Sequence, residues 1–297
     1  MRTDADPTRR RVMTDMERQP ISARVSTADW LAWGALALAA IAAAAGLFVP
    51  HLYRDTDAWV RQAQASDLTT LALAVPILGI GLWQARRGSA LGRLVALGAL
   101  AFLAYGYAIF AFAVETNPMT PLHYAILGLA TWSIGLSLAG WNVEPTAEAA
   151  SGPVPRRTTG IFLLATAALF ALLWLGQIAG SIASGEPAPE LARLGLAANP
   201  VWALDLAFAL PAFAVVGIGL LRDHGWAAPA AMATLVFAAV MGTSILAIFG
   251  FDAMAGAAVD PLPVVLIGGI VLAAIGLLIW RRGQWRSHWE APVSPQP

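Results

Sequence analysis

The sequence predicts an all-α integral membrane protein with eight transmembrane helices. Its composition, its long apolar runs and the distribution of its arginines support this fold class. Of the 297 residues, 58% are hydrophobic and only 12% are charged, and the mean hydropathy is +0.67. A soluble domain is nearer half apolar and a quarter charged, so we expect lipid rather than water to surround most of this chain.

Eight apolar runs are long enough to cross a bilayer. A hydrocarbon core of roughly 30 Å needs about 20 apolar residues in one helical span. Each run is bounded by charged residues, proline or glycine, which are typical of the ends of such spans. The predicted spans are 29–50, 67–85, 91–114, 122–140, 159–183, 200–221, 227–250 and 261–280.

The arginines predict how the chain is oriented. When alternate loops are assigned to opposite sides of the membrane, all but three of the 18 basic residues fall on one side. The exceptions are Arg54, Arg61 and Arg193. Because translocating cations is disfavoured, the arginine-rich side is expected to be the cytoplasm. Eight spans then place both termini there.

Several kinds of function are disfavoured by what the chain lacks. It has no cysteine, which excludes disulfides and thiol chemistry, and no lysine, which excludes a Schiff base. The formal net charge of zero argues against a nucleic-acid partner, since such proteins present a basic face to the phosphates. No phosphate-binding loop is present, and no cofactor is predicted.

The chain divides into two sets of four spans. Residues 1–28 are polar and charged and are expected to form a cytoplasmic tail. The transmembrane units are 29–140 and 159–280, joined by a cytoplasmic linker over 141–158 that is rich in Pro, Ala, Ser and Glu. Residues 281–297 are expected to form a second cytoplasmic tail.

A short match between the two units predicts a tandem repeat. The segment TLALAVP at 70–76 resembles DLAFALP at 205–211, with Leu, Ala, Ala and Pro identical. Chance similarity between apolar segments is the competing interpretation. Four spans per unit would give both copies the same orientation, with a cavity expected at the seam. Pro76 and Pro211 would then kink equivalent helices, because proline lacks an N–H and crowds the preceding turn.

Five segments together resemble a family of uncharacterised bacterial polytopic membrane proteins. They are SDLTTLALAVP, ARRGSALGRL, YGYAIFAF, TNPMTPLHY and VWALDLAFALP. The resemblance covers nearly all eight spans. It implies the architecture and a bacterial plasma membrane, but it brings no activity and no site residues.

Asp205 is the candidate with the clearest signal, because it is the one charged residue that the predicted spans place well inside the membrane. A buried acid is costly there, so a partner such as Tyr, Thr or His from another span is expected. Asn199 and Pro200 suit the cap and first position of its helix. One interpretation is a carboxylate facing a cavity, and the other is an acid that reaches the outer headgroups.

Further candidates are polar side chains near the outer ends of the spans or within them. At the outer ends, ligand binding competes with simple anchoring at the interface, and inside the spans it competes with polar contacts between helices. No spacing places two metal ligands on one helical face, so no metal site is predicted. These candidates are Asp67, His51, His123, Glu115, Tyr105 and Tyr107.

Three classes of function remain. The first is a transporter-like protein that binds a small solute or ion between its two halves, and the second is a non-catalytic partner of other membrane proteins. The third, an intramembrane enzyme, is least favoured because no recognisable set of catalytic groups is present. A cavity lined by helices two, three, six and seven would favour the first class, and gapless packing would favour the second.

Overall fold

The computed structural model describes residues 26–140 and 155–289, and these residues are helical over most of their length. Within these two ranges, eight helices are long and apolar enough to cross a membrane, so the predicted multi-pass, all-helical architecture is confirmed. Most of the predicted tails and linker lies outside the described residues. The last helix continues past the predicted end of its span, to Trp289.

The elements are named in chain order. They are α2 (Thr27–Phe48), α3 (Asp57–Thr69), η1 (Thr70–Ala74), α4 (Val75–Arg86), α5 (Ala90–Ala113), α6 (Thr120–Ala139), α8 (Arg156–Ser184), α9 (Pro189–Leu194), α10 (Pro200–Leu204), η2 (Asp205–Ala209), α11 (Leu210–Leu221), α12 (Ala227–Met254) and α13 (Pro261–Trp289). α3, η1 and α4 form the second span, and α10, η2 and α11 form the sixth.

The second span begins ten residues earlier than predicted, at Asp57 rather than at residue 67. Thr56 caps it, with its hydroxyl accepting a hydrogen bond from the Trp59 N–H. The added turns carry polar residues, among them Arg61, so a search for apolar runs does not detect them. They are helical because one face packs inside the protein, where Trp59 and Ala63 are buried.

Each of these two spans contains a five-residue π-helical turn immediately before its proline region. The Val75 N–H bonds to the Thr70 carbonyl, and the Leu210 N–H bonds to the Asp205 carbonyl, both five residues back. A wider turn relieves the crowding that the rings of Pro76 and Pro211 would cause in a regular helix. The kinks at Pro76 and Pro211 stay a prediction. The backbone hydrogen-bond pattern is irregular next to both prolines.

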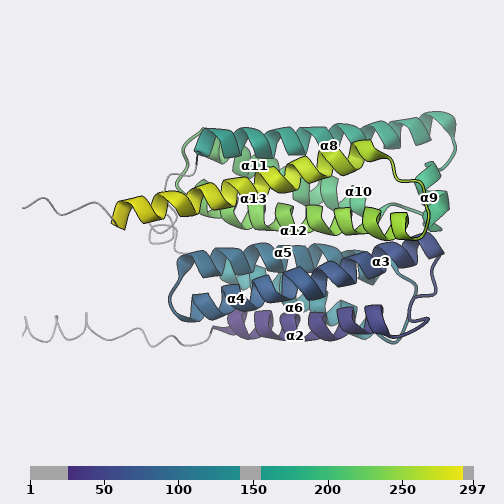
Figure 1. Ribbon diagram of the computed structural model, residues 1–297, viewed down its shortest axis with the longest axis horizontal. Helices are drawn as coiled ribbons and strands as arrows, with labels where there is room; N and C mark the ends of the chain where they lie inside the picture. Colours follow the sequence, from purple (N-terminus) through teal and green to yellow (C-terminus); the bar gives the residue numbers. More distant parts are fainter. Residues whose placement is uncertain (1–25, 141–154, 290–297) are drawn as a thin grey trace, which may run out of the picture.

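The two halves lie side by side, with α5 and α12 in contact where they meet (Figure 1). In the first half α2 and α5 both pack on α6, and α4 packs on α5. In the second half α11 packs on α8, and α12 packs on α13. α2 begins and α13 ends at the same end of the molecule (Figure 1).

Gly98 permits a close approach at the seam. A Cβ at this position would lie 2.5 Å from the Ala233 carbonyl oxygen and 2.6 Å from the Val236 Cβ. α5 and α12 therefore approach nearly backbone to backbone at this level, as small residues allow in membranes.

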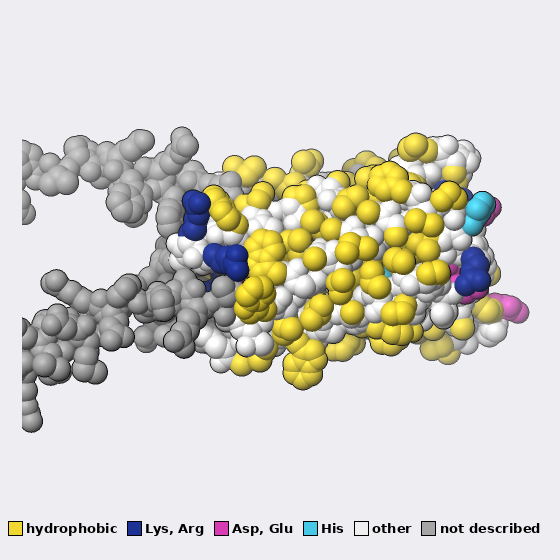
Figure 2. All heavy atoms as spheres, turned by 90° about the horizontal axis from the view of Figure 1, so that it is seen from below, with side chains coloured by type: hydrophobic (Ala, Val, Ile, Leu, Met, Phe, Trp, Pro, Cys, Tyr) yellow, Lys and Arg dark blue, Asp and Glu magenta, His cyan; other side chains and the backbone are white. Residues whose placement is uncertain are grey.

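The outer surface matches a membrane environment. Apolar side chains cover the middle of the molecule, and charged side chains gather at its two ends (Figure 2). One end carries Arg86, Arg156 and Arg222 and is called the arginine-rich end below. The opposite end carries α9 and is called the α9 end.

Candidate functional site

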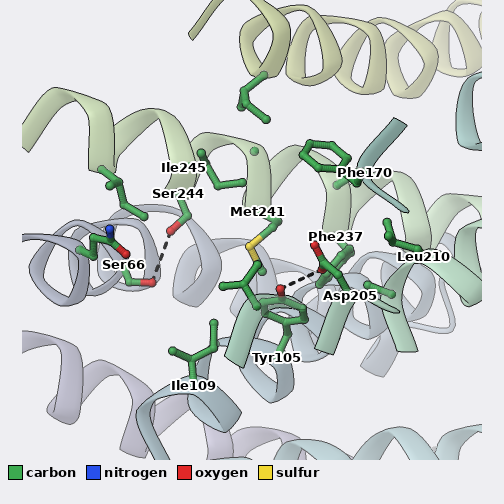
Figure 3. Close-up of a pocket in the computed structure, with 18 of the residues that line it drawn as sticks. Ser66, Tyr105, Ile109, Phe170, Asp205, Leu210, Phe237, Met241, Ser244 and Ile245 are labelled. Carbon is green, nitrogen blue, oxygen red and sulfur yellow. Dashed lines mark hydrogen bonds between the residues drawn. The ribbon is translucent and has the colours of Figure 1, made fainter. Parts of the chain in front are cut away.

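A cavity of about 170 Å³ lies between the two halves. It is lined by α3 and α5 of the first half and by α8, α10, η2, α11, α12 and α13 of the second. Most of the lining side chains are apolar (Figure 3). The polar lining groups used below are Ser66, Tyr105, Trp174, Asp205 and Ser244. The cavity thus occurs at the seam where the repeat hypothesis expects one.

Asp205 lies in the wall of this cavity and has two hydrogen-bond partners. The Tyr105 hydroxyl donates to its Oδ1 at 2.9 Å, and the Trp174 indole N–H donates to its Oδ2 at 2.8 Å. Tyr105 comes from the first half, so this contact crosses the seam. A tyrosine from another span is one of the partners that the sequence predicts, whereas Trp174 is an addition.

The local structure around Asp205 follows from its sequence. The Asn199 side chain accepts hydrogen bonds from the backbone N–H groups of Val201 and Trp202, and Pro200 occupies the first helical position, as predicted. Asp205 then begins the π turn η2. This turn adds a residue to the helical repeat and thereby changes the direction of the side chains that precede Pro211.

The carboxylate of Asp205 keeps hydrogen-bonding capacity for a ligand. A carboxylate offers about four lone-pair sites, and the two protein donors use only part of this capacity. Both donors are neutral, and no arginine lines the cavity. Asp205 therefore has no cationic side chain as a partner among the lining residues, and its free acceptor positions suit a cation or a strong hydrogen-bond donor.

A second polar pair lies on the opposite side of the cavity from Asp205 in Figure 3. The hydroxyl oxygens of Ser66 on α3 and Ser244 on α12 are 3.4 Å apart, and either can be the donor. This pair also joins the two halves. Two separated polar points within an apolar wall are typical of sites that orient a small organic molecule.

Two aromatic contacts close the cavity toward the arginine-rich end. The rings of Phe213 and Phe237 lie 6.0 Å apart, edge to face, and the Tyr105 ring lies 5.8 Å from Phe237. Beyond them, Leu220 and Leu235 are almost fully buried. The structure is therefore tightly packed between the cavity and the arginine-rich end.

The α9 end of the cavity is covered by the segment between α8 and α10. Leu194 packs on Trp59, which also lines the cavity. Asp252 holds this cover to the bundle, because it pairs with Arg61 at 2.8 Å and with Arg193 at 3.7 Å. This ion network was not predicted, because its three members are far apart in the chain and Asp252 is largely buried.

Asp67 lies in a separate, closed site, so the expectation that Asp205 is the one acid well inside a span is wrong. Asp67 is buried within the second span, and the Tyr53 hydroxyl donates to its Oδ2 at 2.6 Å. Burial and the neighbouring Asp67 raise the pKa of Tyr53 above its usual range, so the hydroxyl stays protonated and donates. Gly46 leaves room for this pair.

Tyr107 and His123 belong to the same closed region. Both are buried, their rings lie 5.7 Å apart, and both rings contact Phe110. Tyr107 donates a hydrogen bond to the Ala39 carbonyl at 3.3 Å. Phe110 also lines the cavity, so its ring stands between the cavity and this aromatic cluster.

The remaining candidates lie outside both sites. His51 is exposed in a turn with a positive φ of 57°, and Glu115 is an exposed partner of Arg54 at 3.8 Å. Of the seven ligand candidates, the structure therefore brings only Tyr105 and Asp205 to the cavity. Within 26–140 and 155–280, no three His, Asp or Glu side chains are grouped as metal ligands.

The sequence analysis did not select Trp174, Ser66 or Ser244 as site residues, and of these Trp174 contacts Asp205 directly. Most tryptophans of the chain lie near a predicted membrane edge, as interfacial anchors do. Trp174 instead lies inside the span predicted over 159–183, where its indole N–H needs an acceptor. A tryptophan donor and an acid that both lie within predicted spans could have indicated the contact between Trp174 and Asp205.

Comparisons of the chain with protein-family models, curated proteins and solved structures find no match. The resemblance to bacterial polytopic membrane proteins therefore remains a prediction.

Proposed function

We propose that this multi-pass membrane protein is transporter-like and binds a small organic solute in the cavity between its two halves. The solute has an apolar body and a cationic or hydrogen-bond-donating group that contacts Asp205. The observation that carries this proposal is a cavity of about 170 Å³ at the seam with an intramembrane carboxylate in its wall.

The lining of the cavity favours an organic solute over a bare ion. Metal cations of the hard type require several oxygen ligands, whereas this wall is mainly aliphatic and aromatic. An apolar cavity of about 150 Å³ in another protein stays dry and binds benzene. A cavity of this size therefore suits a molecule that resembles a substituted benzene ring.

The position of the cavity favours transport over a role as an assembly module. A module needs no gap between its halves, whereas here helices two, three, six and seven all line one. The matching π turns before Pro76 and Pro211 support a tandem repeat, and sites at repeat interfaces are typical of secondary transporters. We place the arginine-rich end in the cytoplasm of a bacterial plasma membrane, on the arginine distribution and the family resemblance.

Binding of a fluorinated amine tests the proposal. In phosphatidylcholine nanodiscs, ¹⁹F NMR gives the affinity for 4-fluorophenethylamine and for 1-fluoro-4-propylbenzene, which has the same apolar body but no ammonium group. We expect the amine to bind at least about tenfold more tightly, equivalent to one hydrogen bond to a charged group. Asp205→Asn should abolish this preference, because the amide keeps the shape but not the charge.

Asp260→Asn is the matched control, because Asp260 is exposed and serves only as a cap to the Leu262 N–H at 2.9 Å. It should bind the amine as the native chain does. Equal affinity for the two probes, or full binding by Asp205→Asn, would refute the proposed site. Transport is then measured as amine-driven current in proteoliposomes on a solid support. Tight binding without a current would favour the assembly module.

A further inference from the structure

The second half has an opening that the first half lacks. The first and last helices of the first half, α2 and α6, pack tightly on each other. Their counterparts by chain order, α8 and α13, share no comparable interface, since α8 packs mainly on α11 and α13 packs on α12. The face between α8 and α13 therefore leaves part of the bundle interior uncovered by a helix.

The cavity reaches this gap from the inside. Its wall includes Phe170 and Trp174 of α8 together with Ile267 and Ile270 of α13. The two ends of the cavity are occupied, because Phe213 and Phe237 pack at one end and the α9 cover packs at the other. A sideways path into the cavity runs between α8 and α13, on the apolar outer surface of the molecule.

Two leucines mark the rims of this gap. The face of α8 that lines the cavity carries Phe170 and Trp174. On one side of this face Gly160 packs on Gly217 of α11, and Leu173 lies on the other side. On α13, Leu266 is one turn from the cavity-lining Ile270 and away from the face buried on α12. Both leucines are partly exposed, at 43% and 38% respectively.

We propose that the ligand enters the cavity laterally from the bilayer, between α8 and α13, and is therefore an amphiphile already dissolved in lipid. This inference rests on the proposed function and names its substrate class, a membrane-partitioned amine. The apolar body crosses the rim formed by Leu173 and Leu266, and the ammonium group is transferred to Asp205. A solute that is confined to water has no such route.

Bulky rim variants test the route. Leu173→Trp and Leu266→Trp should narrow the gap, whereas Leu172→Trp and Leu272→Trp add the same ring to positions that are 72% exposed. The ¹⁹F line shape of 4-fluorophenethylamine in phosphatidylcholine nanodiscs gives both the exchange rate and the affinity. We expect the rim variants to slow entry and exit alike, by about fivefold or more, with little change in Kd. The control variants should exchange at the native rate.

The possible outcomes distinguish the lateral entry route from the binding site proposed at Asp205. Native exchange rates in both rim variants, with amine binding that still requires Asp205, would overturn the lateral route and leave the proposed function standing. Faster exchange in Asp252→Asn, which loosens the α9 cover, together with unaffected rim variants, would indicate entry from water and would also overturn it. Failure of the native chain to bind the amine would overturn both proposals.

Discussion

Asp205 and Asp67 are two intramembrane carboxylates with different surroundings. Each accepts a hydrogen bond from a tyrosine hydroxyl, at 2.9 Å and 2.6 Å respectively. Asp67 is 2% exposed and is enclosed by packed side chains, so its hydrogen bond serves the fold. Asp205 lines a cavity and retains free acceptor capacity. The cavity, rather than the acid itself, distinguishes a binding site from a structural one.

Gly46→Ala tests the structural role of Asp67. A Cβ at Gly46 would collide with the Asp67 carboxylate and the Tyr53 hydroxyl, so the pair must separate or the helix must shift. We expect a loss of roughly 1–3 kcal/mol in stability, because a buried carboxyl group loses its hydrogen-bond partner. Thermal unfolding in detergent measures this loss.

Gly34→Ala is the control on the same helix. Its Cβ would meet the Leu129 Cδ1 at 3.4 Å, which is an ordinary contact. Alanine favours helix over glycine by about 1 kcal/mol, so this variant should melt at or above the native temperature. If Gly46→Ala melted at the same temperature as Gly34→Ala, the Asp67–Tyr53 pair would not stabilise the fold.

The two π turns differ in where they place the nearby acid. Asp205 is the first residue of η2, whereas Asp67 precedes η1 by three residues and points into the closed region. The irregular turn therefore orients the acid directly only in the second half. Because π turns are frequent at functional sites, this difference agrees with a binding role for the second half.

Replacing the prolines tests this assignment. Pro211→Ala restores an N–H and removes the ring that disfavours a regular turn, so η2 can tighten and move Asp205. We expect amine affinity to fall by about tenfold, as for a lost hydrogen bond to a charged group. Pro76→Ala should leave the affinity unchanged, since η1 does not line the cavity. Equal effects of the two variants on ¹⁹F-measured affinity would contradict the assignment.

Sequence reasoning located elements better than contacts. Seven of the eight spans begin within three residues of their predicted positions, because about 20 apolar residues in a row are an unambiguous signal. The second span begins early because its first turns are polar and are held by tertiary packing. α9 was not predicted, since six residues are too few for a periodic pattern. The contacts of Trp174 and Asp252 depend on how helices meet, which hydropathy does not encode.

At the scale of the whole molecule, the two halves differ in closure. α2 and α6 pack on each other in the first half, while α8 and α13 share no comparable interface in the second half and both line the cavity. If the halves arose by duplication, the first now serves as a packed support and the second carries the opening. Tyr105 and Ser66 of the first half nevertheless complete the site by reaching across the seam.

Photolabelling with an alkyl diazirine amine can show whether a small amine binds between the two halves. Peptide mapping by mass spectrometry would locate the attached probe. We expect labels on cavity-lining residues of both halves, such as Tyr105 and Met241, which disappear with excess 4-fluorophenethylamine and in Asp205→Asn. Labels confined to lipid-facing residues, or labels that persist in Asp205→Asn, would contradict this expectation.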